Sequence, residues 1–172
     1  MRYDETPAVF RPNLEALAAL LERVRAAVGV PLAVKGRTYR SAAHNSTLPG
    51  ASSTSQHMTA SAADFDPVGI SVAEFLRRLE ASGFDLDTSQ LITYPLGSDH
   101  LHIGLPLANK PANTVLIQTS FLAAAPKYVP VALGDSARVY AQWRTRRGQA
   151  LLVVVVAVVV IGALILSGKF SP

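Results

Sequence analysis

The sequence lacks cysteine and contains only four histidines in 172 residues. Without cysteine there is no disulfide framework and no thiolate metal site, so any metal must be held by His, Asp or Glu. No basic stripe with interleaved aromatic residues is present, and the formal charge of +4 is spread along the chain apart from one concentration near the C-terminus. We therefore expect no nucleic acid partner. The length suits one domain with a real core.

The two ends of the chain differ in hydropathy. The N-terminal stretch "MRYDETPAVFRPN" carries charge throughout and does not resemble a secretion signal. Residues 150–166, in contrast, are 17 uncharged apolar residues, a length at the short end of what spans a bilayer. A core helix this rich in valine would be unusual, because β-branched residues are mediocre helix formers in water. The run predicts a transmembrane helix in contact with the lipid bilayer.

Basic residues flank this apolar run unequally. Arg144, Arg146 and Arg147 precede it, and only Lys169 follows it. The positive-inside rule places the N-terminal domain on the cytoplasmic side. We therefore expect a single-pass membrane protein with a C-terminal anchor, in a bacterial inner membrane or in the membrane of a virus particle.

The remaining chain mixes helical and strand patterns. Apolar residues spaced by three and four predict a helix over 14–28, with Asn13 as its N-cap. Ser71 and Glu74 form a capping box at the start of a second helix. The Ser-, Gly- and Pro-rich residues 46–56 indicate a loop. Strand patterns are grouped rather than alternating regularly with helices, which predicts an α+β fold; they occupy residues 30–36, 61–67, 89–95 and 100–105.

Two short stretches carry residues suited to a metal site. "SQHMTASAADF" holds His57 and Asp64, and "DHLHIG" holds His100 and His102. A catalytic zinc ion takes three protein ligands and leaves one position for water. His57, Asp64 and His102 supply two neutral imidazoles and one carboxylate, which leave net positive charge on the ion. The small residues between His57 and Asp64 allow a close turn around it.

Hydrolysis at such a site needs further groups. A base must take the proton of the attacking water, and Asp99 lies three positions before His102. A developing oxyanion or a substrate carboxylate needs a fixed cation, for which Arg40 is a candidate. The alternatives without a catalytic role are that the His-x-His pair contacts acidic neighbours and that Arg40 is a solvated loop residue.

Three motifs in order carry a resemblance to a known family. "YRS" at 39–41, "SQHMTASAADF" at 55–65 and "DHLHIG" at 99–104 resemble those of the zinc D-alanyl-D-alanine carboxypeptidases. That family includes phage L-alanyl-D-glutamate endolysins and shares its fold with the hedgehog signalling domain. Its second motif reads Ser-x-His-x-x-Gly-x-Ala-x-Asp, and the residues from Ser55 to Asp64 match it except at Ala60, where the family usually has glycine. The resemblance covers roughly residues 10–118.

The resemblance implies a set of roles. Zn²⁺ would be bound by His57, Asp64 and His102, with Asp99 as general base. Arg40 would orient the substrate or stabilise the tetrahedral intermediate. Ser55 would contact the substrate or support the site. His100 departs from the family, because many relatives carry an aromatic residue near that position; it is a candidate substrate-binding residue that could stabilise the oxyanion or compete as a metal ligand. It also implies a hedgehog/DD-peptidase-like fold, a small antiparallel sheet with flanking helices, followed here by one transmembrane helix.

These expectations divide the chain into four parts. Residues 1–125 would form a zinc peptidase-like domain, 126–148 a linker with a basic juxtamembrane segment, 149–167 the transmembrane helix and 168–172 a short tail. The expected function is hydrolysis of an amide bond in the peptidoglycan stem, D-Ala-D-Ala or L-Ala-D-Glu, by a membrane-anchored phage lysis or virion entry enzyme. The alternative is a catalytically inactive zinc-binding domain that serves as a wall-binding or structural membrane protein of a virus particle. Ala60 favours this alternative, and an intact acid at position 99 favours the enzyme.

Overall fold

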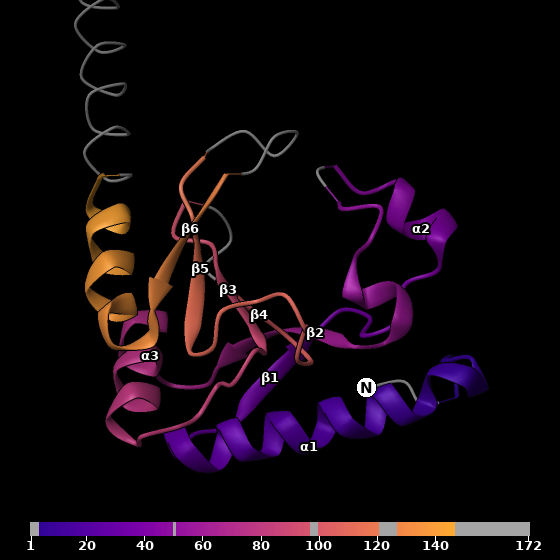
Figure 1. Ribbon diagram of the computed structural model, residues 1–172, viewed down its shortest axis with the longest axis horizontal. Coiled ribbons are helices and arrows are strands. Elements are labelled where there is room, and N and C mark those ends of the chain that lie inside the picture. Colours follow the sequence, from indigo (N-terminus) through magenta and orange to yellow (C-terminus); the bar gives the residue numbers. More distant parts are fainter. Residues whose placement is uncertain (1–3, 50, 97–99, 121–126, 147–172) are drawn as a thin grey trace, which may run out of the picture.

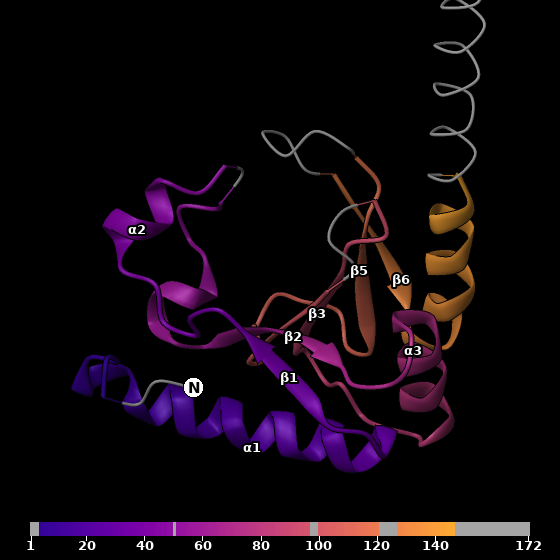
Figure 2. The ribbon, with the colours of Figure 1, turned by 180° about the vertical axis from the view of Figure 1, so that it is seen from behind.

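A computed structural model describes residues 4–49, 51–96, 100–120 and 127–146 of the chain. Helix α1 (Arg11–Val28) crosses beneath a six-stranded sheet, and α2 (Ala42–Ser46) lies at the opposite end of the molecule from α3 (Val72–Ala81), as both Figure 1 and Figure 2 show. Two short 3-10 helices, η1 (Ala8–Phe10) and η2 (Gln56–Thr59), precede α1 and the second strand. Residues 133–146 are also helical.

The sheet has the strand order β1-β2-β4-β3-β5-β6. All neighbouring strands run antiparallel except β3 and β5, which are parallel, so the sheet is mixed. The antiparallel sheet expected from the sequence is therefore corrected to a mixed one, while the α+β class agrees. The strands are β1 (Leu32–Lys35), β2 (Ala62–Pro67), β3 (Gln90–Thr93), β4 (Leu101–Gly104), β5 (Thr114–Gln118) and β6 (Tyr128–Ala132).

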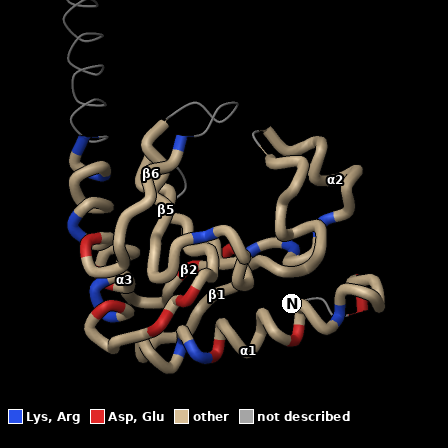
Figure 3. Tube along the Cα trace, viewed as in Figure 1, with Lys and Arg blue, Asp and Glu red and all other residues tan. Residues whose placement is uncertain are grey.

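One face of the sheet packs against the helices. Alternate strand residues such as Phe65, Leu101 and Ile117 are fully buried there, in one cluster with apolar side chains of α1 and α3. Burial of each large apolar side chain contributes roughly 1.5–3 kcal/mol, so this cluster stabilises the packing of the helices on the sheet. Basic and acidic residues both occur along α1 and α3 (Figure 3). Residues between the buried ones, Asp64 and His102 among them, point to the opposite face.

The predicted start of one helix agrees with the structure, and the predicted start of the other does not. The Ser71 hydroxyl accepts a hydrogen bond from the Glu74 backbone amide, which confirms the predicted start of α3. Helix α1 begins earlier than expected, at Arg11, and Asn13 lies inside it. The Asn13 amide donates instead to the Thr59 carbonyl at 3.0 Å, and so ties α1 to η2.

The C-terminal part departs from the expectations. Residues 126–148 were expected to be a linker, but β6 pairs with β5 there, and Tyr140 in the following helix is buried in the core. Pro130 does not prevent the strand, because β6 is the edge of the sheet. Residues 128–146 are thus part of the domain.

The expected membrane anchor is also corrected. Within the described part of the chain, no helix is both long enough and apolar enough to cross a bilayer. The predicted segment, 150–166, and the basic residue Arg147 beside it lie outside the described residues. The single-pass location and the bilayer partner, which depend on that helix, are therefore not supported.

Candidate metal centre

Three side chains lie close together on the face of the sheet opposite α1 and α3. Asp64 of β2 and His102 of β4 are directly opposite each other in the antiparallel register, so their side chains point to the same side. His57 comes from η2, which immediately precedes β2. His57 and His102 are buried, and 16% of the Asp64 side chain is exposed.

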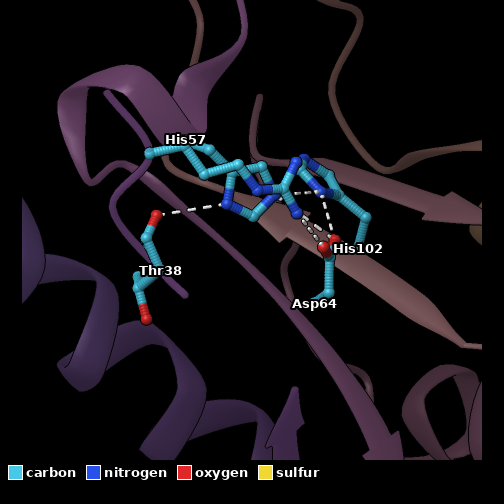
Figure 4. A network of polar contacts seen from close by, with 5 residues as sticks. Thr38, His57, Asp64 and His102 are labelled. Carbon is cyan, nitrogen blue, oxygen red and sulfur yellow. Dashed lines mark hydrogen bonds and ion pairs between the residues drawn. The ribbon is translucent and has the colours of Figure 1, made fainter. Parts of the chain in front are cut away.

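The ligand atoms form a closed triangle (Figure 4). His102 Nδ1 lies 2.9 Å from Asp64 Oδ1, His57 Nε2 lies 3.4 Å from the same oxygen, and the two imidazole nitrogens are 3.3 Å apart. A tetrahedral zinc ion with bonds of about 2.0–2.1 Å separates its ligand atoms by about 3.3 Å. The three residues predicted from the sequence to bind zinc therefore form a group that could hold a metal ion.

A backbone contact fixes how His57 can act. Its Nδ1 lies 3.1 Å from the carbonyl oxygen of Thr38, which can only accept a hydrogen bond. In neutral His57 the proton is therefore on Nδ1, and Nε2 keeps a lone pair that points toward the other two residues. Two imidazole nitrogens and a carboxylate oxygen this close together repel one another unless they share a proton or a cation. The donor set thus fits a divalent metal.

Arg40 contacts the cluster. Its Nη2 donates to Asp64 Oδ2 at 2.6 Å, and its backbone amide donates to the His57 carbonyl at 2.9 Å. The guanidinium leaves Oδ1 of Asp64 facing the histidines and carries further N–H groups that Asp64 does not use. The arginine predicted to contact substrate is thus a direct partner of a candidate metal ligand, and its side chain is 20% exposed.

Protonation follows from burial and these contacts. Burial raises the pKa of the Asp64 carboxyl, but its interactions with the rings of His102 and His57 outweigh this effect and hold that pKa well below its usual range. Burial lowers the pKa of His102 despite the opposing effect of Asp64. A charged carboxylate and neutral imidazoles are the forms that bind a metal.

The remaining predicted residues are placed in different ways. His100 stacks on Tyr94 with ring centroids 4.4 Å apart, and burial lowers the pKa of His100. Ser55 is the residue before η2, half-buried, and its hydroxyl makes no cap hydrogen bond. Asp99 lies outside the described residues.

The sequence did not reveal two supports of the cluster. The Thr38 carbonyl carries no sequence signal, since any residue offers one. Gln56 lies over Gly104, and its amide donates to the Leu105 carbonyl at 2.9 Å. A Cβ on Gly104 would be 2.0 Å from Gln56 Oε1, so glycine is needed for this packing. The glycine two residues after the last histidine of "HLHIG" was the sequence feature that could have indicated this packing.

Ala60 has the backbone conformation that its motif position suggests. It is fully buried, with φ 55° and ψ 25° in the left-handed region that favours glycine. The Ser61 amide donates to the Gln56 carbonyl at 2.9 Å across this turn. The loop between His57 and Asp64 thus closes around alanine.

Comparison with known proteins gives one match. A family model described as Peptidase M15 matches residues 3–104, more than half of the chain, and this stretch contains Arg40 and all three residues of the cluster. No curated protein and no solved structure matches the chain.

Proposed function

Because the chain belongs to the peptidase M15 family, we propose that it is a zinc-dependent peptidase that hydrolyses an amide bond in the peptide stem of peptidoglycan. The observation that carries the proposal is the triangle of ligand atoms from His57, Asp64 and His102 on the open face of the sheet. Its side lengths suit zinc, and its two-histidine, one-carboxylate composition is that of hydrolytic zinc sites.

The protein residues have distinct parts in this proposal. Zinc bound by the cluster would polarise the scissile carbonyl and acidify a water molecule. Thr38 holds His57 in the tautomer that presents Nε2. Arg40 fixes the Asp64 carboxylate and, with its remaining N–H groups, binds a carboxylate or the developing oxyanion of the substrate.

Three further roles come from the sequence motifs. Asp99 acts as the general base that takes a proton from water and returns it to the leaving amine. His100 contacts the substrate from the same end of β4 as His102, where it stacks on Tyr94. Ser55 contacts the substrate beside His57. A phage lysis or virion entry setting stays a prediction from the sequence.

The backbone at Ala60 is compatible with a metal site, which the enzyme and the inactive zinc-binding domain share. The alanine keeps the left-handed conformation, and the three ligand atoms still converge behind it. Loss of the glycine therefore leaves the loop in a shape that supports metal binding. This supports a functional site, although alanine in this conformation costs on the order of 1 kcal/mol.

The test is digestion of purified peptidoglycan by the full chain, with released fragments identified by mass spectrometry. The proposal expects release that stops on chelation, returns with zinc and leaves a single kind of new peptide end. Asp64→Asn should abolish release. Asp66→Asn is the matched control, since Asp66 lies two residues along β2 and pairs with Lys35 at 2.5 Å, outside the cluster.

Two results would count against the proposal. Release that persists with full chelation would mean that the cluster does not drive the reaction. A folded, zinc-loaded chain that releases nothing from any peptidoglycan would favour the binding-domain alternative.

A further inference from the structure

A pocket lies on the sheet face that carries the metal cluster. It has a volume of about 240 Å³ and lies over the far strands of the sheet, between β5, β6 and the loop that leads to β5. We call it the Lys110 pocket; its lining includes Ser89, Gln90, Asn109, Lys110, Thr114 and Leu116.

The register of the sheet puts this pocket in line with the cluster. Asp64 is opposite His102, His102 is opposite Ile92, Ile92 is opposite Leu116, and Leu116 is opposite Pro130, another lining residue. Residues paired in this way point to the same face of a sheet. The metal cluster and the Lys110 pocket therefore lie on the same row of paired residues, which runs across the strands.

The spacing along the row matches a short peptide. Neighbouring strands lie about 4.8 Å apart, so Leu116, two strands from His102, is about 10 Å away. An extended peptide advances roughly 3.3–3.6 Å per residue, so about three residues reach from the cluster to the pocket. The volume of the Lys110 pocket is below the ~300–1,000 Å³ that is usual for pockets that bind a whole small molecule. A pocket of this size suits one residue of a longer substrate.

The residues that line the Lys110 pocket favour a negatively charged ligand group. Lys110 is the only charged residue among those that line the pocket, and the others that are polar carry hydroxyl or amide groups. None of the ion pairs found between described residues includes Lys110. A cation among neutral donors, with no carboxylate among the residues that line the pocket, suits an anionic group.

The wall that carries Lys110 is held in place by the backbone. The Leu107 amide donates to the Thr88 carbonyl at 3.2 Å, and the Lys110 amide donates to the Leu107 carbonyl at 3.1 Å. At the other end of the loop the Asn113 amide donates to the Asp87 carbonyl at 2.8 Å. The loop is thus fixed to the segment before β3, so the pocket exists before a ligand arrives.

We propose that the Lys110 pocket binds a carboxylate-bearing residue of the stem peptide about three residues from the cleaved bond. The inference rests on the proposed function and narrows it. In a stem pentapeptide cut before its last D-alanine, the third residue back from the bond is D-glutamate, whose α-carboxylate is free. The pocket therefore favours cleavage of the terminal D-Ala-D-Ala bond and makes Lys110 a specificity residue.

The test is an NMR titration of the chelated full chain, in which no zinc-dependent hydrolysis can occur. The probe is L-alanyl-γ-D-glutamyl-L-lysyl-D-alanyl-D-alanine, compared with the same peptide in which the glutamyl α-carboxylate is an amide. We expect the acid to shift the amides of Gln90 and Thr114 and to bind at least tenfold more tightly than the amidated peptide. Lys110→Gln should remove that difference, whereas Arg25→Gln, on the exposed surface of α1, should keep it.

The readouts separate this inference from the proposed function. Equal affinity for the two peptides, no shift at Gln90 and Thr114, or no effect of Lys110→Gln would overturn the pocket assignment even if the zinc-loaded chain is active. Carboxylate-dependent binding at the pocket would support it even if the chain cuts nothing. In an active chain, Lys110→Gln should raise KM for the acid about tenfold and leave kcat unchanged.

Discussion

Asp64 and His102 face each other across β2 and β4, with Oδ1 and Nδ1 2.9 Å apart, although 38 residues separate them in the chain. The pairing of two strands therefore sets this distance, and of the three residues only His57 reaches the cluster from outside the sheet, in η2. A site built on paired strands is held more rigidly than one built on loops alone.

Removing the shared carboxylate should abolish tight metal binding. Asp64→Asn leaves two neutral imidazoles and removes the only anion among the three residues, so we expect zinc affinity to fall by at least 100-fold. Competition with a chromogenic chelator measures it. Asp66→Asn should leave the affinity within about threefold of the original, and an equal loss in both variants would mean that β2 itself is disturbed.

Arg40 should affect turnover more than metal content. Arg40→Met removes the partner of Asp64 Oδ2 but none of the three ligand atoms, and loss of such outer contacts typically costs about 10–100-fold in affinity or activity. We expect kcat/KM to fall in that range while zinc stays bound at saturation. Arg37→Met, whose exposed side chain lies near Glu5, is the control and should retain full activity.

Position 60 should tolerate glycine and reject branched side chains. Ala60→Gly should stabilise the folded state by about 1–2 kcal/mol, because it relieves backbone strain. It also removes a buried methyl group, which costs about 0.8 kcal/mol, and it raises the conformational entropy of the unfolded chain, which costs roughly 0.4–1 kcal/mol. These effects nearly cancel, so the free energy of unfolding should change by less than about 1 kcal/mol. Ala60→Val adds bulk at a fully buried, left-handed position and should cost more than about 2 kcal/mol. Urea denaturation distinguishes the two, and a valine variant as stable as the parent would disprove the strain.

The metal-free protein should lose stability as the pH falls below about 6.5. Burial lowers the pKa values of His100 and His102 in the folded state. The unfolded chain therefore takes up protons first, near the ordinary histidine pKa of about 6.5, and is favoured as the pH falls. The lowered pKa of Asp64 adds stability that is lost only below about 4. Thermal melts with chelator from pH 8 to 5 should show a falling Tm, and a rising Tm would contradict this sign.

The sequence predicted the local parts of this molecule better than their assembly. The N-cap at Ser71, the strand that ends at Pro67 and the neighbouring strands around 90–104 follow from residue patterns. The parallel pairing of β3 with β5 has no local signal, because it depends on the course of the chain between the strands. The segment 126–148 was predicted to be a linker because Pro130 interrupts it, but a proline is compatible with an edge strand such as β6.

The candidate site shows the same division. Motif spacing singled out His57, Asp64 and His102, which the fold brings together. It could not show that Arg40 contacts Asp64 or that a Thr38 carbonyl orients His57, since both depend on how the loop after β1 returns to the sheet. The Lys110 pocket was equally hidden, because its lining comes from β3, β5, β6 and a loop.

Gly104 should be required for a fully formed metal site. A methyl group there would lie 2.0 Å from Gln56 Oε1, so Gly104→Ala must displace the Gln56 side-chain amide and break its hydrogen bond to the Leu105 carbonyl, which ties η2 to the end of β4. Movement of η2 shifts His57 Nε2 away from the other two ligand atoms, and we expect about a tenfold loss of zinc affinity. Gly134→Ala is the matched control, since its added methyl would meet only the end of the Glu80 side chain, at 3.2 Å, which can move aside. Equal zinc affinity in both variants, measured by chelator competition, would mean that Gln56 does not position His57.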